Sequence, residues 1–597
     1  MKDLTPHIVE EIYKSTKPPR FQERISDHLG LSRCLLLKPT CSFFLGNLCL
    51  REKNRISMFR FWLQDSLFRV FPWSRPRTSG LRLDVARGER FSFQAAVIAA
   101  EESQVAVRVS SPPGIRTTLR RVGFVPLFAR TPRTPASDIE GCARIPGLVP
   151  DPLLPDTDLC LPRGSAIAWW ISGETDPEVR PGKKQVRVTL TPERKHGGPR
   201  HLDVDLRVHP LRLRARKGFD VTHWFYTDAL CDWYHVTPWS EGFWEIVRPY
   251  FRNLVAHGQN MVYIPVFTPP LDGVKRPTQL LGVRRTGKHR YAFDWRHVDR
   301  WIAMARASGI SRFEWCHLVT QWGARHAIRI YEKKNGQDVL LWPPETPATG
   351  PAYRAFLGQY LPQLHRFLER HGLLGKSVFH LSDEPHGDEP LANYRQARAM
   401  LRELAPWMTV MDALSDIRFA REKLVDVPVP ILREAKMFVD EGIPCWTYFC
   451  CAPVGRWLNR LLTTPLTKVR LSGWLFWRFQ HLGFLHWGYN YWYRKQTREL
   501  IDPYLVLDGG GWPGWQSGDP FVVYPGKDGP IDSLRWEVFA ESLEDYRLLQ
   551  TLGVSPSSLA DEFRDYHRFP RDPAWVRRRR AQLLAKDREK PGSFPAS

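Results

Sequence analysis

The chain has 597 residues, 43% of them hydrophobic, and a formal net charge of +23. This length is too great for a single core and predicts two or three domains, while the hydrophobic content excludes wholesale disorder. Residues 1–57 hold 10 basic against 6 acidic residues (+4), and residues 571–590 hold 8 against 3 (+5), so +14 is spread over the long middle section. Such a spread argues against a nucleic-acid partner.

Residues 1–57 show no clear periodicity, and we expect them to form a poorly ordered extension. They contain no standard signal peptide, and charged residues and a proline interrupt the apolar stretch from Leu31 to Leu50. No segment is therefore expected to span a membrane, and a cytoplasmic location is the default expectation. The change in composition after residue 57 makes Met58 an alternative start of the natural protein.

The ten cysteines contain no CxxC pair and no metal-ligand spacing with histidine. We expect reduced thiols in place of a disulfide scaffold, and we expect neither a metal nor another cofactor.

Residues 58–212 are predicted to form a β-sandwich domain. Apolar and polar residues alternate with a period of two, most clearly in Leu202–Val208, which is typical of strands with one buried face. Turns rich in proline and glycine, such as Ser111–Gly114, separate these runs. The domain shows no catalytic motif, and the basic segment 211–218 after it is predicted to be a hinge.

Residues 219–552 are predicted to form a catalytic (β/α)8 barrel of the TIM type, with a C-terminal segment that closes against it. Strand-like runs alternate with amphipathic helices, and glycine follows several of these helices, as expected for helix C-caps. The eight predicted strands begin near residues 221, 261, 313, 378, 407, 425, 445 and 483. A doubly wound open sheet is the alternative, but no glycine-rich phosphate loop follows the first strand.

Residues 553–597 are predicted to be a basic tail that is helical at first and then disordered. Its densest charge run, Arg577–Arg580, is expected to form a solvated helix face.

The fourth predicted strand ends in Ser382-Asp383-Glu384-Pro385. Pro385 cannot donate to a sheet, so the strand should end at the two acids and present them at the C-terminal mouth of the barrel. Neighbouring side chains on a strand point to opposite faces, so both acids can reach one pocket only if the strand has ended or bulged there. We predict that Asp383 and Glu384 are the catalytic pair.

Two acids in a mouth walled by aromatic residues favour glycoside hydrolysis, and the 24 tryptophans of the chain suit stacking against sugar rings. Adjacent acids are poorly placed to flank a sugar as an acid and an opposed nucleophile. They suit a retaining, substrate-assisted mechanism, in which Glu384 is the acid/base and Asp383 orients the 2-acetamido group of an N-acetylhexosamine. The residues predicted to bind the glycan substrate are Trp446, Tyr448, Trp487, Asn490, Tyr491 and His380. For His380, a hydrogen-bonding role is favoured over metal ligation.

Eight short segments, taken in this order and spacing, resemble those of a known family: Glu89–Gln94, Val122–Pro126, Pro150–Pro155, Ser382–Pro385, Trp446–Tyr448, Gly483–Asn490, Val523–Gly526 and Glu544–Tyr546. On these segments the chain, from about residue 59 to 552, is similar to glycoside hydrolase family 123, whose C-terminal region is also catalogued as domain of unknown function 4091. The resemblance implies a β-sandwich followed by a (β/α)8 barrel. It also implies β-N-acetylgalactosaminidase activity by substrate assistance, with Asp383 and Glu384 in the roles given above.

Three other readings stay open at this point. A glycosidase with a distant second carboxylate, Asp412 or Glu314, would act on a sugar without an acetamido group. A catalytically silent carbohydrate-binding protein would bind its glycan with Glu384 dispensable. A nucleic-acid binder is the least favoured because the positive charge is spread.

Overall fold

The computed structural model describes residues 58–76, 80–268 and 278–586. All of these residues belong to one compact unit of the chain. The predicted N-terminal extension, residues 1–57, lies outside them, as does the end of the predicted tail after residue 586. No helix of the described part is long and apolar enough to cross a membrane.

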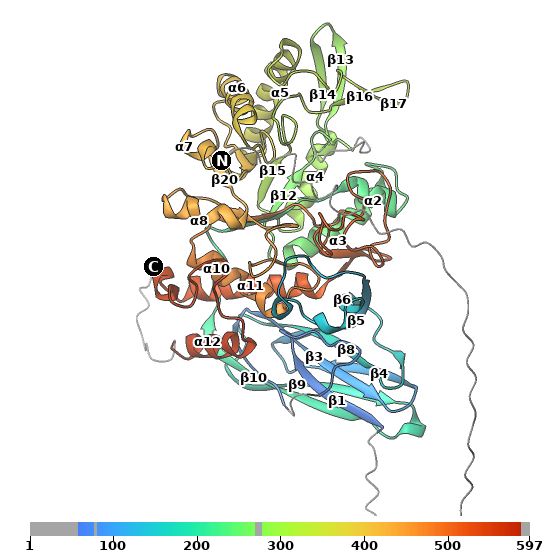
Figure 1. Cartoon of the computed structure of the whole chain (residues 1–597). Helices are drawn as coiled ribbons and strands as arrows, with labels where there is room; N and C mark the ends of the chain where they lie inside the picture. The colour runs from blue at the N-terminus through green and yellow to red at the C-terminus, as the bar shows by residue number, and fades with distance from the viewer. Residues whose placement is uncertain (1–57, 77–79, 269–277, 587–597) are drawn as a thin grey trace, which may run out of the picture. The chain divides into compact units, whose positions relative to one another are not determined.

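Two five-stranded sheets make up the N-terminal part of the described chain (Figure 1). One has the order β1-β3-β8-β5-β6 and the other has the order β2-β10-β9-β4-β7. Apolar residues of both sheets alternate with polar ones and meet in a shared core, as predicted for Leu202–Val208. The strands are β1 (Phe59–Asp65), β2 (Arg82–Arg87), β3 (Arg90–Ala99), β4 (Ser103–Ser110), β5 (Ile115–Leu127), β6 (Gly147–Leu154), β7 (Leu159–Leu161), β8 (Ala166–Thr175), β9 (Gly182–Pro192) and β10 (Arg200–Arg212).

The segment after β10, which was predicted to be a hinge, contacts the C-terminal end of α11 (Leu534–Thr551). The backbone N–H of Arg214 donates to the Thr551 side chain at 3.1 Å, and that of Lys217 donates to the Gln550 side chain at 3.0 Å. Side chains at the end of α11 therefore supply partners for two backbone groups of this linker.

Eight parallel strands, separated by helices, follow the N-terminal sheets. Ladders join them in three groups, β12-β15-β18, β19-β20 and β21-β22-β11. Single parallel bridges from Phe379 to Val410 and from Ile431 to Tyr448 connect these groups into one series. Within the described residues no ladder joins β11 to β12, so closure of the series into a barrel is not shown. The strands are β11 (Asp220–His223), β12 (Met261–Ile264), β15 (Arg312–Trp315), β18 (Ser377–Phe379), β19 (Met411–Ala413), β20 (Val427–Val429), β21 (Thr447–Tyr448) and β22 (Gly483–His486).

The connections between these strands carry the helices and two hairpins. Glycines with positive φ follow three of the helices at the predicted positions: Gly258 (83°), Gly309 (102°) and Gly372 (60°). The helices are α2 (Thr227–Trp233), α3 (Glu241–Ala256), α4 (Arg296–Ala307), α5 (Pro351–Arg370), α6 (Asp388–Leu404), α7 (Arg418–Arg421), α8 (Leu432–Asp440), α9 (Leu466–Arg470) and α10 (Ser472–Arg478). The hairpins are β13 (Gly282–Gly287) with β14 (Arg290–Asp294), and β16 (Tyr331–Lys334) with β17 (Gln337–Leu340).

The fifth strand of the series starts later than predicted. The apolar run from Trp407 predicted a strand over 407–411, whereas β19 starts at Met411 and pairs with β20. Of the four earlier residues, Met408 and Val410 are buried, Trp407 is partly buried and Thr409 is exposed, and only Val410 forms a bridge. Apolar residues indicate that a segment is buried, and in this segment they begin before the first residue of the strand.

α11 lies between the N-terminal sheets and the parallel strands, and most of its side chains are buried, including charged ones (Figure 1). Arg535 bonds to Asp151 of β6 at 3.0 Å, and Glu537 bonds to Arg90 of β3 at 2.6 Å. The helix follows the hairpin of β23 (Val523–Pro525) and β24 (Pro530–Asp532). Ion pairs therefore join the two parts of the described chain through one helix.

The tail continues the folded part as α12 (Pro573–Lys586), and of the expected solvated run Arg577–Arg580 only the Arg578 side chain is mostly exposed. Arg580 is buried and forms ion pairs with Glu89 of the N-terminal sheets and Asp545 of α11. Arg577 pairs with Asp65 at 2.7 Å. The charge run is thus a docking face, because acidic partners distant in sequence lie opposite it.

Candidate active site

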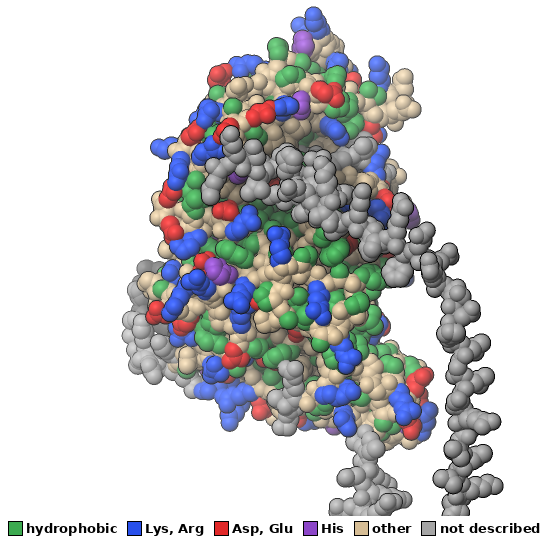
Figure 2. Space-filling model, in the orientation of Figure 1, with side chains coloured by type: hydrophobic (Ala, Val, Ile, Leu, Met, Phe, Trp, Pro, Cys, Tyr) green, Lys and Arg blue, Asp and Glu red, His purple; other side chains and the backbone are tan. Residues whose placement is uncertain are grey.

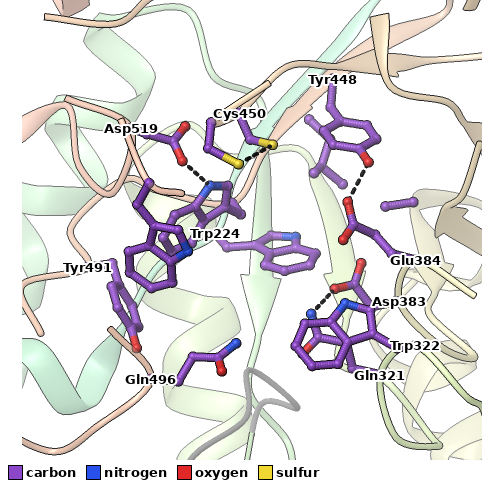
Figure 3. Close-up of a pocket in the computed structure, with 15 residues that line it drawn as sticks. Trp224, Gln321, Trp322, Asp383, Glu384, Tyr448, Cys450, Tyr491, Gln496 and Asp519 are labelled. Carbon is purple, nitrogen blue, oxygen red and sulfur yellow. Dashed lines mark hydrogen bonds between the residues drawn. The ribbon is translucent and has the colours of Figure 1, made fainter. Parts of the chain in front are cut away.

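A pocket of about 700 Å³, solvent at its mouth included, lies at the C-terminal ends of the parallel strands (Figure 3). Residues from the ends of β11, β15, β18, β19, β21 and β22, or from the loops after them, line it. This is the end of a parallel strand series at which functional side chains are usually placed. Those that concern the chemistry are Trp224, Gln321, Trp322, Asp383, Glu384, Tyr448, Trp487, Tyr491 and Asp519.

Asp383 and Glu384 both line this pocket because β18 has ended four residues before Asp383. Glu384 has a φ of +47°, a left-handed conformation that is rare for residues other than glycine. Its N–H donates to the Ala413 carbonyl at 2.8 Å, while the Asp383 carbonyl accepts from the Trp322 N–H at 2.7 Å. The neighbouring loops therefore hold the turn that brings both side chains to one pocket.

The two carboxylates have different partners. Figure 3 shows Glu384 directed toward Tyr448, whose hydroxyl donates to it, and Asp383 directed toward Gln321, whose amide donates at 2.9 Å. Burial, and then the charge of Glu384, raise the pKa of Tyr448 well above its usual value, so its hydroxyl keeps the proton that it donates. Asp383 is buried, with 4% of its surface exposed.

Asp412, at the centre of β19, fixes the backbone just before the acids. It accepts from the N–H of Leu381 at 3.0 Å, from the N–H of Ser382 at 3.1 Å and from the hydroxyl of Tyr394 at 2.6 Å. Burial raises the pKa of Asp412, and its bond to His380 partly offsets this effect. A fully buried carboxylate thus organises the end of β18.

His380 lies beneath the pocket between two buried carboxylates. Its Nδ1 lies 3.0 Å from Asp412 and its Nε2 lies 2.6 Å from Glu314. Burial disfavours the imidazolium, but the hydrogen bonds and charges of the two acids outweigh burial and raise the pKa of His380 to about 10. Glu314 also accepts from the indole of Trp224 at 2.7 Å, which ties this network to a residue that lines the pocket.

Aromatic rings form the wall opposite the acids. Trp487 lies 5.2 Å from Tyr491 and 5.3 Å from Trp515, measured between ring centroids, and its N–H donates to Asp519 at 3.0 Å. Trp322, which is 49% exposed, lies beside Asp383 (Figure 3). The rings offer apolar faces and the carboxylates offer polar partners, the combination that a sugar ring requires.

Three residues predicted to bind the substrate do not line this pocket. Trp446 is buried against Gly483, because it precedes Tyr448 by two residues along an extended segment and so lies about 6–7 Å deeper. Asn490 is buried, bonds through both amide atoms to the backbone of Tyr226 and forms a β-bridge with Phe521, so its side chain has a structural role. His380 is buried in the network described above and supports the site from below.

The two carboxylates that were considered as distant partners do not reach the pocket either. Asp412 and Glu314 are both fully buried, and each accepts hydrogen bonds from side chains beneath the acids. The structure therefore gives no support to an opposed second carboxylate from either residue.

Sequence reasoning missed several residues that line the pocket. Trp224 directly follows β11 and could have been found by the rule that singled out Asp383, but the first strand was expected to run past it. Gln321, Trp515 and Asp519 come from irregular loops, where no periodicity indicates which way a side chain points.

Two groups of side chains in the described part lie close enough to hold a metal ion: His317 with His380 and Asp412, and His257 with Asp532 and Glu537. In the first, both nitrogens of His380 are already bonded to carboxylates. In the second, Glu537 is paired with Arg90 and Arg120. A cation would compete with positive charge already present, so we interpret both groups as ion-pair networks.

Comparison with known proteins identifies a protein family whose model matches this chain. The family model described as "Glycoside hydrolase 123, catalytic domain" matches residues 224–552. A similar solved structure is that of a family 123 glycoside hydrolase from Clostridium perfringens, studied for glycolipid glycan hydrolysis. It is 14% identical, with a TM-score of 0.67, and the match covers 84% of this chain and 90% of that one. At this identity the likeness concerns the fold alone.

A glycoside hydrolase family 5 structure from Bacteroides vulgatus is more distant. It is 13% identical over 45% of this chain and 58% of that one, and its TM-score of 0.27 is too low to support an argument. The curated proteins contain no match to this chain.

Proposed function

The chain belongs to glycoside hydrolase family 123 and is a glycosidase, and from this premise we propose that it removes N-acetylhexosamine, with β-N-acetylgalactosamine as the first choice, by a retaining, substrate-assisted mechanism. We further propose that its parallel strand series is a (β/α)8 barrel of the TIM type. The position of the pocket at the C-terminal ends of the strands supports this assignment.

The observation that carries the mechanism is that Asp383 and Glu384, adjacent in sequence, line one pocket with separate partners. Two side chains on neighbouring Cα atoms, about 3.8 Å apart, reach a sugar from the same side. An acid and a nucleophile on the enzyme must flank the ring from different positions. The nucleophile is therefore assigned to the substrate.

In this mechanism Glu384 protonates the glycosidic oxygen as the bond to the anomeric carbon breaks. The carbonyl oxygen of the 2-acetamido group attacks that carbon, while Asp383, held by Gln321, accepts from the acetamido N–H and stabilises the positive charge of the oxazolinium ion. Glu384 then takes a proton from water, which opens the ring and regenerates the acid. The anomeric configuration is retained because inversion occurs twice.

A panel of nitrophenyl glycosides tests the proposal on wild type and Glu384→Gln protein. We expect hydrolysis of the β-N-acetylgalactosaminide and no hydrolysis of the matching β-galactoside, which has no acetamido group. In Glu384→Gln we expect kcat to fall at least about a hundredfold, the contribution of a positioned general acid. Glu422→Gln, which removes a charge from a surface pair with Arg395, is the matched control.

Equal turnover of the two galactose substrates would rule out substrate assistance. Binding of the glycoside without turnover, unchanged in Glu384→Gln, would favour a carbohydrate-binding protein instead. A thiazoline mimic of the oxazolinium ion should compete with the substrate, since it occupies the place of the intermediate.

A further inference from the structure

Two neighbouring cysteines lie in the wall of the pocket. Cys450 and Cys451 both line it, both are partly exposed, and their sulfur atoms are 3.7 Å apart (Figure 3). They follow Tyr448, whose hydroxyl donates to Glu384, by two and three residues. The proposed glycosidase mechanism uses neither thiol.

We propose that Cys450 and Cys451 are a thiol modification site, a dithiol that exchanges with low-molecular-weight disulfides such as oxidised glutathione and closes into a disulfide between neighbours. The dithiol is accessible through the pocket, and the two sulfur atoms are already in contact. Buried thiols such as those of Cys316 and Cys445 lack this access.

The external disulfide accepts the two electrons that the cysteine pair loses. The Cys451 thiolate attacks one of its sulfur atoms, the external S–S bond breaks, and one thiolate leaves and takes up a proton. The Cys450 sulfur then loses its proton to solvent, attacks the Cys451 sulfur and expels the second thiolate. Two cysteine thiols are oxidised and one external disulfide is reduced to two thiols.

The order of attack follows from the surroundings of Cys450. Contact with the Cys451 thiol, and then burial, raise the pKa of Cys450 well above its usual value. Its sulfur therefore keeps its proton in the resting state and is assigned the second step.

Such a bond is strained and therefore easily reversed. Neighbouring Cα atoms are about 3.8 Å apart across a trans peptide, while disulfides usually join Cα atoms about 4.4–6.8 Å apart. Strained disulfides are more readily reduced and are the labile ones in proteins. The pair is thus suited to switch between two states within the range of a thiol buffer.

Closure would act on the site through the chain that both share. Drawing the sulfur atoms from 3.7 Å to bonding distance distorts the peptide between them, which begins two residues after Tyr448, the last residue of β21. This effect on hydrolysis rests on the proposed function, whereas formation of the disulfide does not.

The test is made by mass spectrometry on the full chain in a series of glutathione buffers of increasing oxidised fraction. After alkylation and digestion, we expect the wild-type peptide with Cys450 and Cys451 to lose two hydrogen atoms and to resist alkylation, and dithiothreitol to restore both reactive thiols. Cys160→Ser, which removes an exposed thiol of the N-terminal sheets, should behave as wild type. In Cys451→Ser the bridged peptide should be absent.

A wild-type peptide that stays doubly alkylated at the most oxidising ratio would overturn the proposal.

Activity gives a second measurement, in which each protein is compared with its own reduced form. Oxidation should lower wild-type hydrolysis of the active nitrophenyl glycoside about tenfold, the loss expected when one hydrogen bond to a charged carboxylate is broken. Cys451→Ser should show no such loss. If no glycoside is hydrolysed, the proposed function fails, and the mass measurement still decides whether the site exists.

Discussion

Tyr448 determines the position of the proposed acid Glu384, and this contact can be tested at the level of one atom. Its hydroxyl is a protonated donor because burial and the charge of Glu384 raise its pKa well above the usual value. In Tyr448→Phe the ring remains and only the donor is lost. We expect kcat/KM to fall about ten- to a hundredfold, since a hydrogen bond to a charged group contributes about 1.5–3 kcal/mol.

The matched control for this substitution is Tyr234→Phe. The Tyr234 hydroxyl bonds to that of Tyr250 at 2.8 Å and to the Gly526 carbonyl, and it does not line the pocket. Steady-state kinetics should leave its kcat/KM within about twofold of wild type. A Tyr448→Phe enzyme as active as this control would show that the contact with Glu384 has no catalytic role.

Tyr448 also shows which parts of the site could be predicted from the sequence. Tyr448 and Asp383 were found because they were expected at the ends of predicted strands, and the end of a parallel strand is a position that periodicity can locate. Depth along a strand is harder to predict, so Trp446 was placed with Tyr448 although it lies below the pocket. Gln321 belongs to a loop, and its contact with Asp383 depends on tertiary packing that no local pattern encodes.

At the level of elements, β15, β18 and β19 are joined by the buried series Glu314, His380 and Asp412. The pKa of His380 is about 10 in the folded protein and about 6.5 in an unfolded chain. The folded state therefore holds a proton that the unfolded state releases as the pH rises. The stabilisation is complete below about pH 6.5 and is lost between that pH and 10.

This network predicts an alkaline loss of stability. Between pH 6.5 and pH 9 we expect the free energy of unfolding to fall by about 3 kcal/mol more in wild type than in His380→Gln, which has no group to titrate there. Urea unfolding at several pH values measures the difference, and the variant subtracts the contributions of all other groups. Parallel pH curves for the two proteins would mean that His380 is not charged in the folded state.

The alternation of strands and helices after residue 219 was predictable because each element repeats its apolar residues with its own period. The details of pairing were not, and the start of β19 at Met411 shows why. Met408, which precedes it, is buried outside any ladder, so hydrophobicity located the strand but not its first residue.

At the scale of the whole molecule, many of the arginines that contribute to the high net charge form ion pairs in the interior. Arg90, Arg470, Arg535 and Arg580 all pair with carboxylates that lie on other elements of the described chain. On the face shown in Figure 2, the remaining basic side chains are scattered among acidic ones. Composition alone could not separate arginines of the interior from those of the surface, because their partners are distant in sequence.

Arg580 offers the clearest test of this interior role. It joins α12 to Glu89 of the N-terminal sheets and to Asp545 of α11, and it is 2% exposed. Two positions before it on the same helix, Arg578 pairs with Asp572 at 3.4 Å and its side chain is 64% exposed. The two arginines therefore differ in burial and share helix, charge and side-chain length.

We expect Arg580→Gln to lower the free energy of unfolding by about 3–5 kcal/mol, because it leaves the buried carboxylate of Glu89 without its cation. Arg578→Gln should change it by less than about 0.5 kcal/mol, as an exposed pair contributes little. Urea unfolding followed by tryptophan fluorescence measures both. Equal effects in the two variants would mean that the run Arg577–Arg580 is a solvated helix face, as its sequence predicts. A large loss in Arg580→Gln alone would show that the tail is an integral part of the fold, joining the N-terminal sheets to α11.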